Sequence, residues 1–229
     1  QGKIVRQRSI KNIIDEIEYW KKNFNIKMFI FRDPVFSINR KHTVQFCDEL
    51  YNRKLNIRFV IETHLKILDS ELIHLLLRCG LKAVKVGVES AETNVLKEEG
   101  RFTVKKDEQL SKIRELEKNN IQVAAMFIIG FPSDEDSTIR STIDYAKFLN
   151  TTYAQFSIWT PYPGTPVFNE FKDKIIKNDY KSFNQYNLVY KHNKFTGDQV
   201  KNYLDLAYTK YYLRVSWLYK YLKSFVVTT

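Results

Sequence analysis

Polar side chains stand at the carboxyl ends of five apolar segments that are rich in Val, Ile, Phe and Ala. A carboxylate in such a place costs desolvation free energy unless it has a partner. Several of them converging would suit a polar ligand that carries amines or hydroxyls. The candidate residues are Asp33, Glu62, Thr63, His64, Glu89, Ser90, Gly130, Phe131, Pro132, Gln155, Ser157 and the loop 161–166.

The last of these segments runs into a loop with three prolines and a glycine, Thr160-Pro161-Tyr162-Pro163-Gly164-Thr165-Pro166. Proline removes a backbone donor and restricts the residue before it, so a strand must stop here. In α/β proteins, ligands bind at the carboxyl ends of the strands. The sequence therefore predicts a stiff loop at a binding site, with a rigid surface turn as the alternative.

A pair of carboxylates offers a second chemistry. Glu62 and Glu89 end neighbouring segments, and two carboxylates at adjacent strand ends are what glycoside hydrolysis requires. His64 is the one histidine at a strand end and is a further candidate. No Ser-His-Asp pattern and no HExxH motif occurs. Cys47 and Cys79 lie far apart in apolar helical settings, a pattern typical of plain thiols in a reducing, cytoplasmic protein.

The elements that must position these residues alternate between strand and helix. This rhythm predicts βαβ units and a parallel sheet, with a (βα) barrel as the leading architecture and a doubly wound sheet as the alternative. Neither GxGxxG nor GxxxxGK[ST] is present. Ser133 with Asp136 has the pattern of a capping box for the last of these helices. The expected strands are residues 26–31, 57–63, 81–90, 122–132 and 154–158, and the expected helices follow Ser9, Lys41, Asp69, Lys105 and Ser133.

The composition is that of a globular chain with a strong positive charge. Its 229 residues are 44% hydrophobic, which is ample for a core, and no apolar run is long enough to span a membrane. The net charge of +11 favours anionic partners such as nucleotides, RNA or a membrane surface, although lysines spread over helices also form ordinary solvated faces. Because Gln1 is not an initiator methionine, we expect the chain to begin after processing, after cutting or inside a longer polypeptide.

The amino-acid composition changes after Phe168, where Tyr, Phe and Lys become frequent. This change predicts a boundary between a barrel domain at residues 1–168 and a helical extension at residues 169–229. Thr196 is expected to cap a long helix whose apolar stripe covers the core, with membrane or partner docking as the alternative. The stripe has a heptad-like spacing, formed by Leu204, Tyr208, Tyr211, Val215, Leu218 and Leu222.

At these residues the chain resembles the radical S-adenosylmethionine (SAM) enzymes, within the branch that often carries an N-terminal cobalamin-binding domain. The resemblance covers about residues 2–168 in the family's order, and more loosely residues 180–221. The segments that carry it are GKIVRQRSIKNIIDEIEYW, FIFRDPVF, FVIETH, KVGVES, FIIGFPSDED and SIWTPYPGTPVF. The resemblance implies an α/β fold, a partial (βα)6 TIM-like barrel that here lacks its first strand and has a C-terminal helical extension.

The resemblance also implies cofactors and site residues. A [4Fe–4S] cluster on a CxxxCxxC loop would bind SAM and reduce it to a 5′-deoxyadenosyl radical, and cobalamin and an electron donor such as flavodoxin or ferredoxin are further expectations. By position, the SAM contacts would be Arg32, Asp33, Pro34, Glu62, Glu89, Ser90, Ile128, Gly130, Phe131 and Pro132. The residues lining the rest of the site would be His64, Gln155, Ser157, Pro161, Tyr162, Gly164 and Thr165.

The chain departs from the family in having no CxxxCxxC motif, and Cys47 and Cys79 cannot replace it because such a cluster needs three clustered thiolates. We therefore expect the motif to lie upstream, in a longer enzyme that performs methyl transfer or ring formation. A tRNA substrate is disfavoured because no RNA-binding module follows the barrel. The alternatives are a hydrolytic barrel using Glu62 and Glu89, and a degenerate barrel that binds without catalysis.

Overall fold

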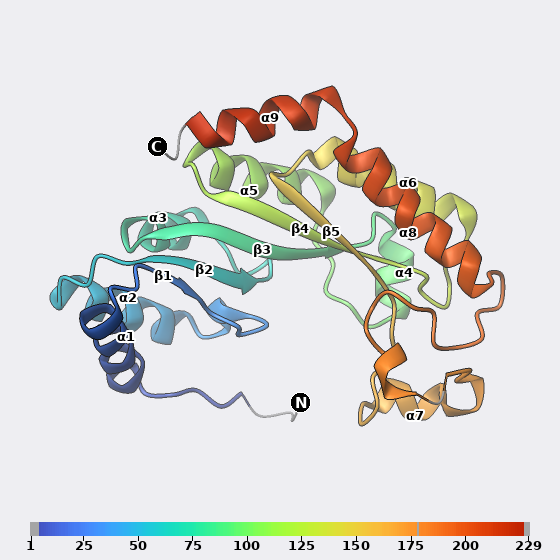
Figure 1. Cartoon of the computed structure of the whole chain (residues 1–229), viewed down its shortest axis with the longest axis horizontal. Helices are drawn as coiled ribbons and strands as arrows, with labels where there is room; N and C mark the ends of the chain where they lie inside the picture. Colours follow the sequence, from blue (N-terminus) through green and yellow to red (C-terminus); the bar gives the residue numbers. More distant parts are fainter. Residues whose placement is uncertain (1–4, 178, 227–229) are drawn as a thin grey trace. The chain divides into compact units, whose positions relative to one another are not determined.

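The computed structural model describes residues 5–177 and 179–226 and contains one five-stranded sheet in the order β1-β2-β3-β4-β5 (Figure 1). A sequential order is that of a barrel, because a doubly wound sheet reverses its strand order. The predicted strands are confirmed, as β1 (Met28–Ile30), β2 (Arg58–Thr63), β3 (Leu81–Glu89), β4 (Gln122–Ile129) and β5 (Tyr153–Ile158). The helices are α1 (Ile10–Phe24), α2 (Arg40–Asn52), α3 (Ser70–Arg78), α4 (Thr93–Glu98), α5 (Lys106–Lys118), α6 (Asp136–Leu149), α7 (Pro166–Glu170), α8 (Gly197–Tyr212) and α9 (Val215–Val226), with short 3-10 turns η1 (Phe36–Ile38), η2 (Lys172–Lys174) and η3 (Tyr180–Ser182).

The chain divides into two compact units. Unit 1 contains Gln1–Gly87 and Val104–Ala124, and unit 2 contains Val88–Thr103 and Ala125–Thr229. The strands β3 and β4 each contribute residues to both units. These two compact units do not test the domain boundary predicted after Phe168, which stays a prediction.

The sheet of unit 1 is parallel and separates a buried face from an open one. Parallel partners include Phe29 with Phe59 and Glu62 with Lys85. Phe59 is fully buried, as are the alternate residues of β2 and β3 beneath the helices. The helix α3 ends at Arg78, and Gly80 follows its C-cap with a φ of +106°. An added Cβ there would lie 2.0 Å from the Ile57 carbonyl oxygen, so only glycine is accommodated.

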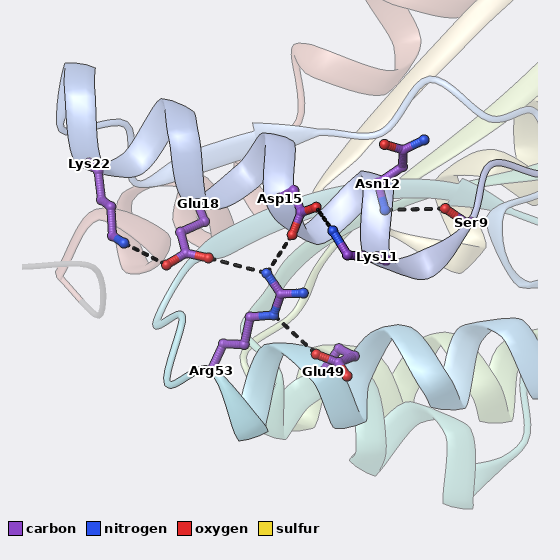
Figure 2. Close-up of polar contacts among 8 residues, drawn as sticks. All are labelled: Ser9, Lys11, Asn12, Asp15, Glu18, Lys22, Glu49 and Arg53. Carbon is purple, nitrogen blue, oxygen red and sulfur yellow. Dashed lines mark hydrogen bonds and ion pairs between the residues drawn. The ribbon is translucent and has the colours of Figure 1, made fainter.

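An ionic cluster joins α1 to α2, and Figure 2 shows Arg53 of the α2 terminus reaching between carboxylates. The guanidinium lies 2.6 Å from Asp15 and 3.2 Å from Glu18, both on α1, and 3.2 Å from Glu49 on α2. The helix α1 begins at Ser9, whose hydroxyl accepts a hydrogen bond from the Asn12 N–H, as predicted for an N-cap. The cluster thus links the two helices through ion pairs.

Unit 2 places α6 and α8 around β4 and β5, with the rings of Phe127 and Phe156 stacked 5.2 Å apart between the strands. The predicted cap of α6 is wrong by two residues. Its N-cap is Glu135, in a reciprocal pair with Thr138, and Ser133 lies outside the helix. The reason is that the Glu135 N–H donates to the Thr138 hydroxyl at 2.9 Å, so the reciprocal pair forms around Glu135.

The helix α8 runs along β5, which is the last strand in the sheet order (Figure 1). The Tyr208 hydroxyl donates to the carbonyl of Phe156 and accepts from its N–H, at 2.9 and 3.1 Å. Tyr212 does the same for Ala154, at 2.7 and 3.0 Å. Four helical residues rise about 6 Å and two strand residues about 6.6 Å, so the spacings match. The tyrosines therefore satisfy backbone groups of an edge strand that would otherwise lack partners.

The predicted long helix after Thr196 is two helices. Thr196 caps α8 as predicted, but α8 ends at Tyr212 and α9 begins at Val215. The side chain of Arg214 donates to the carbonyl oxygens of Tyr211, at 2.7 Å, and Lys147, at 2.8 Å, which takes an acceptor that a continuing helix would use. The stripe accordingly covers the core only as far as Tyr211. Within the described residues no helix is both long and apolar enough to cross a membrane.

Candidate functional site

Glu89 ends β3 in an unusual backbone conformation, with φ of +65°. This left-handed region is costly for a residue other than glycine or asparagine and is found at functional sites. Its carboxylate is 25% exposed and lies 3.5 Å from the guanidinium of Arg101. Burial raises the pKa of Glu89, and the positive charge of Arg101 opposes that rise. The residue is therefore a constrained carboxylate at a strand end, as an interaction with a polar ligand requires.

Ser90, the next residue, is buried and fixed within the protein. Its hydroxyl lies 3.2 Å from the Thr142 hydroxyl on α6 and accepts from the N–H of Glu92 at 3.1 Å. The Thr142 oxygen also accepts from the N–H of Ala91 at 3.1 Å. Ser90 thus ties the loop after β3 to α6, and its arrangement suits holding Glu89 in place better than direct ligand contact.

The loop after β4 is held by a buried carboxylate that the sequence patterns did not single out. Asp134 is 2% exposed, and one carboxylate oxygen accepts from the N–H groups of both Gly130 and Phe131 at 2.9 Å. The other oxygen accepts from the Thr138 hydroxyl at 2.6 Å. Burial raises the pKa of Asp134, against the lowering effect of these three donors. The N–H groups of Gly130 and Phe131 are therefore already engaged.

The carbonyl oxygens of the same two residues are engaged from the other side. The Tyr190 hydroxyl donates to the Gly130 carbonyl at 2.9 Å, and Nε2 of His192 lies 2.9 Å from the Phe131 carbonyl. Nδ1 of His192 accepts from the N–H of Lys194 at 3.0 Å, so the ring is the neutral tautomer with its proton on Nε2. The Phe131 side chain is fully buried. This loop can therefore shape a site through its rigid backbone, and neither side chain offers a polar contact.

The remaining candidates on β4 and β5 lie on the strand faces away from the buried core. Ile128 and Pro132 are half-buried, and Gln155 is exposed. Ser157 is half-buried and its hydroxyl donates to the Phe127 carbonyl at 3.3 Å. Ile128 can thus present an apolar surface and Gln155 an amide.

The proline-rich loop after β5 contains a turn at Pro163 and Gly164, and its place at a binding site stays a prediction. Pro161 is buried, Tyr162 is 38% exposed, and Gly164 takes a φ of +83°. The Thr165 hydroxyl donates to the Tyr162 carbonyl at 2.7 Å and accepts from the N–H of Phe168 at 3.2 Å, where it caps α7. The loop is therefore a preformed element with one partly exposed aromatic side chain.

A buried polar contact beside this loop also escaped sequence reasoning. Trp159 is 5% exposed, and its side chain lowers the pKa of Glu99, in the connection after α4. Burial raises the pKa of Glu99, while Arg101 lowers it. Trp159 also packs on Tyr190, with ring centroids 5.0 Å apart. Glu99, Arg101, Asp134 and His192 lie in segments without strand or helix periodicity, so no pattern signalled them.

In unit 1 the predicted residues Arg32, Asp33 and Pro34 follow β1 and line one hollow of about 850 Å³. Its wall combines basic groups such as Arg8 with an acidic one, Glu16, and with aromatic rings. A hollow of this size is in the range of small-molecule sites. These three consecutive residues lie on a surface that has both charges and apolar area, and their contact with SAM stays a prediction.

Glu62 and His64 are not among the described residues that line this hollow. Glu62 is half-buried on the open face of β2, opposite Lys85 of β3 in the parallel register. Nδ1 of His64 accepts from the N–H of Lys66 at 3.1 Å, and burial is the main cause that lowers the pKa of its ring. Through this hydrogen bond, His64 stabilises the turn after β2. Lys85 is a charged residue of the open face that alternation within the strand could have indicated.

No group of three His, Cys, Asp or Glu residues within residues 5–177 and 179–226 could hold a metal ion. Cys47 and Cys79 contact each other, and the Cys79 thiol donates to the Cys47 carbonyl at 3.7 Å. Their mutual hydrogen bond and burial raise the pKa of Cys47, which keeps its thiol protonated. Two thiols so placed do not fit a [4Fe–4S] cluster.

Comparison with known proteins identifies relatives of this chain. The model of the Radical SAM superfamily matches residues 1–146. An uncharacterized methyltransferase of Pyrococcus horikoshii is 27% identical over 96% of this chain and 48% of its own length. The anaerobic magnesium-protoporphyrin IX monomethyl ester cyclase of Rubrivivax gelatinosus is 30% identical over 78% of this chain and 32% of its own length. The chain thus spans about half the length, or less, of these relatives.

A solved structure has a similar fold. The radical S-adenosylmethionine methyltransferase TsrM from Kitasatospora setae, with cobalamin and a [4Fe–4S] cluster bound, matches with a TM-score of 0.66. The match has 21% identity and covers 73% of this chain and 34% of that one. This likeness confirms the α/β fold predicted as a partial barrel. The family match over residues 1–146, which is more than half of the chain, shows that the chain belongs to the radical SAM superfamily.

Proposed function

We propose that this chain is the barrel portion of a radical SAM enzyme that cleaves SAM reductively and directs the radical to methyl transfer or ring formation. The observation that carries the proposal is the family match over residues 1–146. The reaction classes come from the relatives, which include methyltransferases and a cyclase. Two of the structural relatives, TsrM and OxsB, have cobalamin bound, which supports a cobalamin-dependent reaction.

Each unit, taken by itself, contains residues whose charge or apolar surface suits contact with part of SAM. In unit 2, the Glu89 carboxylate has the charge and placement to accept hydrogen bonds from hydroxyl or ammonium groups. Ile128 offers an apolar surface for a flat ring. In unit 1, the segment Arg32–Pro34 lines a hollow with both polar and apolar walls. Within unit 2 we assign Glu89 and Ile128 to binding and orienting SAM. Arg32–Pro34 are assigned to the same ligand on their own account, within unit 1.

The cluster itself does not fit the residues of this chain, because Cys47 and Cys79 are its only cysteines. We propose that its ligands belong to a preceding segment of a longer polypeptide, and we derive no step through it. An electron donor such as flavodoxin or ferredoxin would follow from the same chemistry. The role left to this chain is to hold SAM and to exclude water from it, which the rigid loops after β4 and β5 suit.

Binding of SAM to the chain tests the proposal without the cluster. Equilibrium dialysis with labelled SAM is expected to detect binding, and Glu89→Gln is expected to weaken it about tenfold, because a charge-assisted hydrogen bond is lost. Glu98→Gln on α4 is the matched control, since Glu98 is exposed. Equal affinity in the two variants would remove Glu89 from the site. No binding at millimolar SAM would contradict the proposed role of this chain.

A further inference from the structure

Cys47 and Cys79 are the two cysteines of the chain, and the fold of unit 1 brings them together from positions 32 residues apart. Cys47 lies within α2, on the face that packs into the core, and is 1% exposed. Cys79 is the C-cap of α3, a helix that packs against α2, and its side chain is half-buried. The two residues therefore meet where the end of α3 lies against the side of α2.

The contact between the two residues includes both side chains. The Cys79 thiol donates to the Cys47 carbonyl oxygen at 3.7 Å. The Cys79 side chain is the largest influence on the pKa of Cys47, which it raises. The Cys47 side chain is in turn the largest influence on the pKa of Cys79, which it lowers. Such mutual effects arise between thiols that are direct neighbours.

Burial and charge give the two thiols different roles. Cys47 is enclosed by the core and keeps its proton, so an oxidant in solution does not reach a nucleophilic sulfur there. Cys79 is half-buried, and after Cys47 the positive charge of Arg78 also lowers its pKa, against burial, which raises it. An accessible thiol of lowered pKa beside a second thiol is the arrangement of a redox-active pair, in which the second thiol resolves the first adduct.

We propose that Cys47 and Cys79 form a reversible intrachain disulfide by exchange with a low-molecular-weight disulfide such as oxidised glutathione. The Cys79 thiolate attacks one sulfur of that disulfide, forms a mixed disulfide and releases the first glutathione thiolate. Cys47 then loses its proton and attacks the Cys79 sulfur, which releases the second glutathione thiolate. Two electrons pass from the protein thiols to glutathione, and the two protons follow through solvent. The exchange needs neither SAM nor a cluster, so it is independent of the function proposed for the barrel.

Equilibration of the chain with reduced and oxidised glutathione under argon tests the proposal. Free thiols are trapped with N-ethylmaleimide in denaturant and counted by mass spectrometry. In an excess of oxidised glutathione we expect both thiols to disappear, with no glutathione left on the protein. Proteolytic mapping is expected to show the peptide of Cys47 linked to that of Cys79, and dithiothreitol is expected to restore both thiols.

Single variants separate the roles of the two thiols. Cys47→Ser is expected to stop at the mixed disulfide on Cys79, because no resolving thiol remains. Cys79→Ser is expected to take up glutathione about tenfold more slowly than Cys47→Ser, because its remaining thiol is buried and protonated. Circular dichroism checks that each variant keeps its fold, and mapping of the unsubstituted chain decides the proposal if a variant fails to fold.

Three outcomes would overturn the proposal. The first is that both thiols stay free in an excess of oxidised glutathione. The second is glutathione retained on both cysteines, which would mean that the two sulfur atoms cannot reach each other in the folded chain. The third is a disulfide between two chains, seen as a dimer on a non-reducing gel, which would place the resolving thiol in a second copy.

Discussion

Glu89 combines a left-handed backbone with a carboxylate that is largely buried. Burial raises its pKa, and Arg101 only partly offsets this effect. The folded chain therefore binds this proton more tightly than the unfolded chain does. The stability that the group contributes is fully present below the unfolded pKa and is lost as the pH rises through the folded pKa. At neutral pH the ionised carboxylate is thus a cost to folding, as is common at ligand sites.

The variant Glu89→Gln is accordingly expected to raise the melting temperature at pH 7, because it removes the buried charge and keeps the backbone conformation. The gain should shrink as the pH falls toward about 4, where an ordinary glutamate protonates. Thermal unfolding at several pH values measures it, with Glu98→Gln as the control. A melting temperature lowered at pH 7 would mean that the contact with Arg101 outweighs the desolvation.

Gly130 is constrained both by its backbone conformation and by the close approach of a side chain on α8. Its φ is +76°, and an added Cβ would lie 3.1 Å from Cγ1 of Val200 on α8. Gly164 has a φ of +83° but no atom within 4 Å of such a Cβ. Gly164→Ala is expected to cost about 1–2 kcal/mol for the backbone conformation alone. Gly130→Ala is expected to cost about 1 kcal/mol more, because Val200 must also move.

Urea unfolding of the two glycine variants measures this difference. The comparison isolates the close approach to α8, since both positions share the left-handed conformation. Equal losses of unfolding free energy would show that Val200 moves aside without cost.

At the scale of elements, the contact of α8 with β5 depends on tyrosine hydroxyls. Tyr208→Phe and Tyr212→Phe each remove the partner of one N–H and one carbonyl on β5. Leaving such groups unsatisfied is expected to cost about 1–3 kcal/mol per variant. Tyr219→Phe on α9 is the control, because Tyr219 is 70% exposed. Urea unfolding measures all three, and a cost no greater than that of the control would show that water replaces the hydroxyls.

At the scale of the whole molecule, the number of cysteines decides which cofactor this chain can hold. Anaerobic treatment with iron and sulfide is expected to leave the chain without the visible absorption of a [4Fe–4S] cluster, because two thiols cannot supply three ligands. The variant Cys47→Ser, Cys79→Ser serves as the control and should behave identically. A stoichiometric cluster in the unsubstituted chain would contradict the assignment of the ligands to another segment.

The strands and most helices follow from local patterns that act over a few residues. Apolar runs such as residues 122–129 predicted strands, and the caps Ser9, Asp69 and Thr196 predicted helix starts, because each signal lies next to the element that it specifies. The apolar stripe after Tyr211 predicted burial that does not occur. Periodicity indicates which residues share a helical face, but it does not indicate whether a partner covers that face.

Sequence alone was sufficient to indicate the order of the elements, the family and the carboxylates and loops at the strand ends, since these depend on residue type and near neighbours. Tertiary structure decided which of those groups remain available. Asp134 and Tyr190 use up the backbone of Gly130 and Phe131, and Thr142 holds the hydroxyl of Ser90. Arg214 divides the C-terminal helix and leaves the stripe of α9 outside. The bonds of Asp134 to Gly130 and Phe131, and of Arg214 to Tyr211, span three or four residues. The contacts made by Tyr190, Thr142 and Lys147 join residues 50 to 70 positions apart, to which local patterns are insensitive.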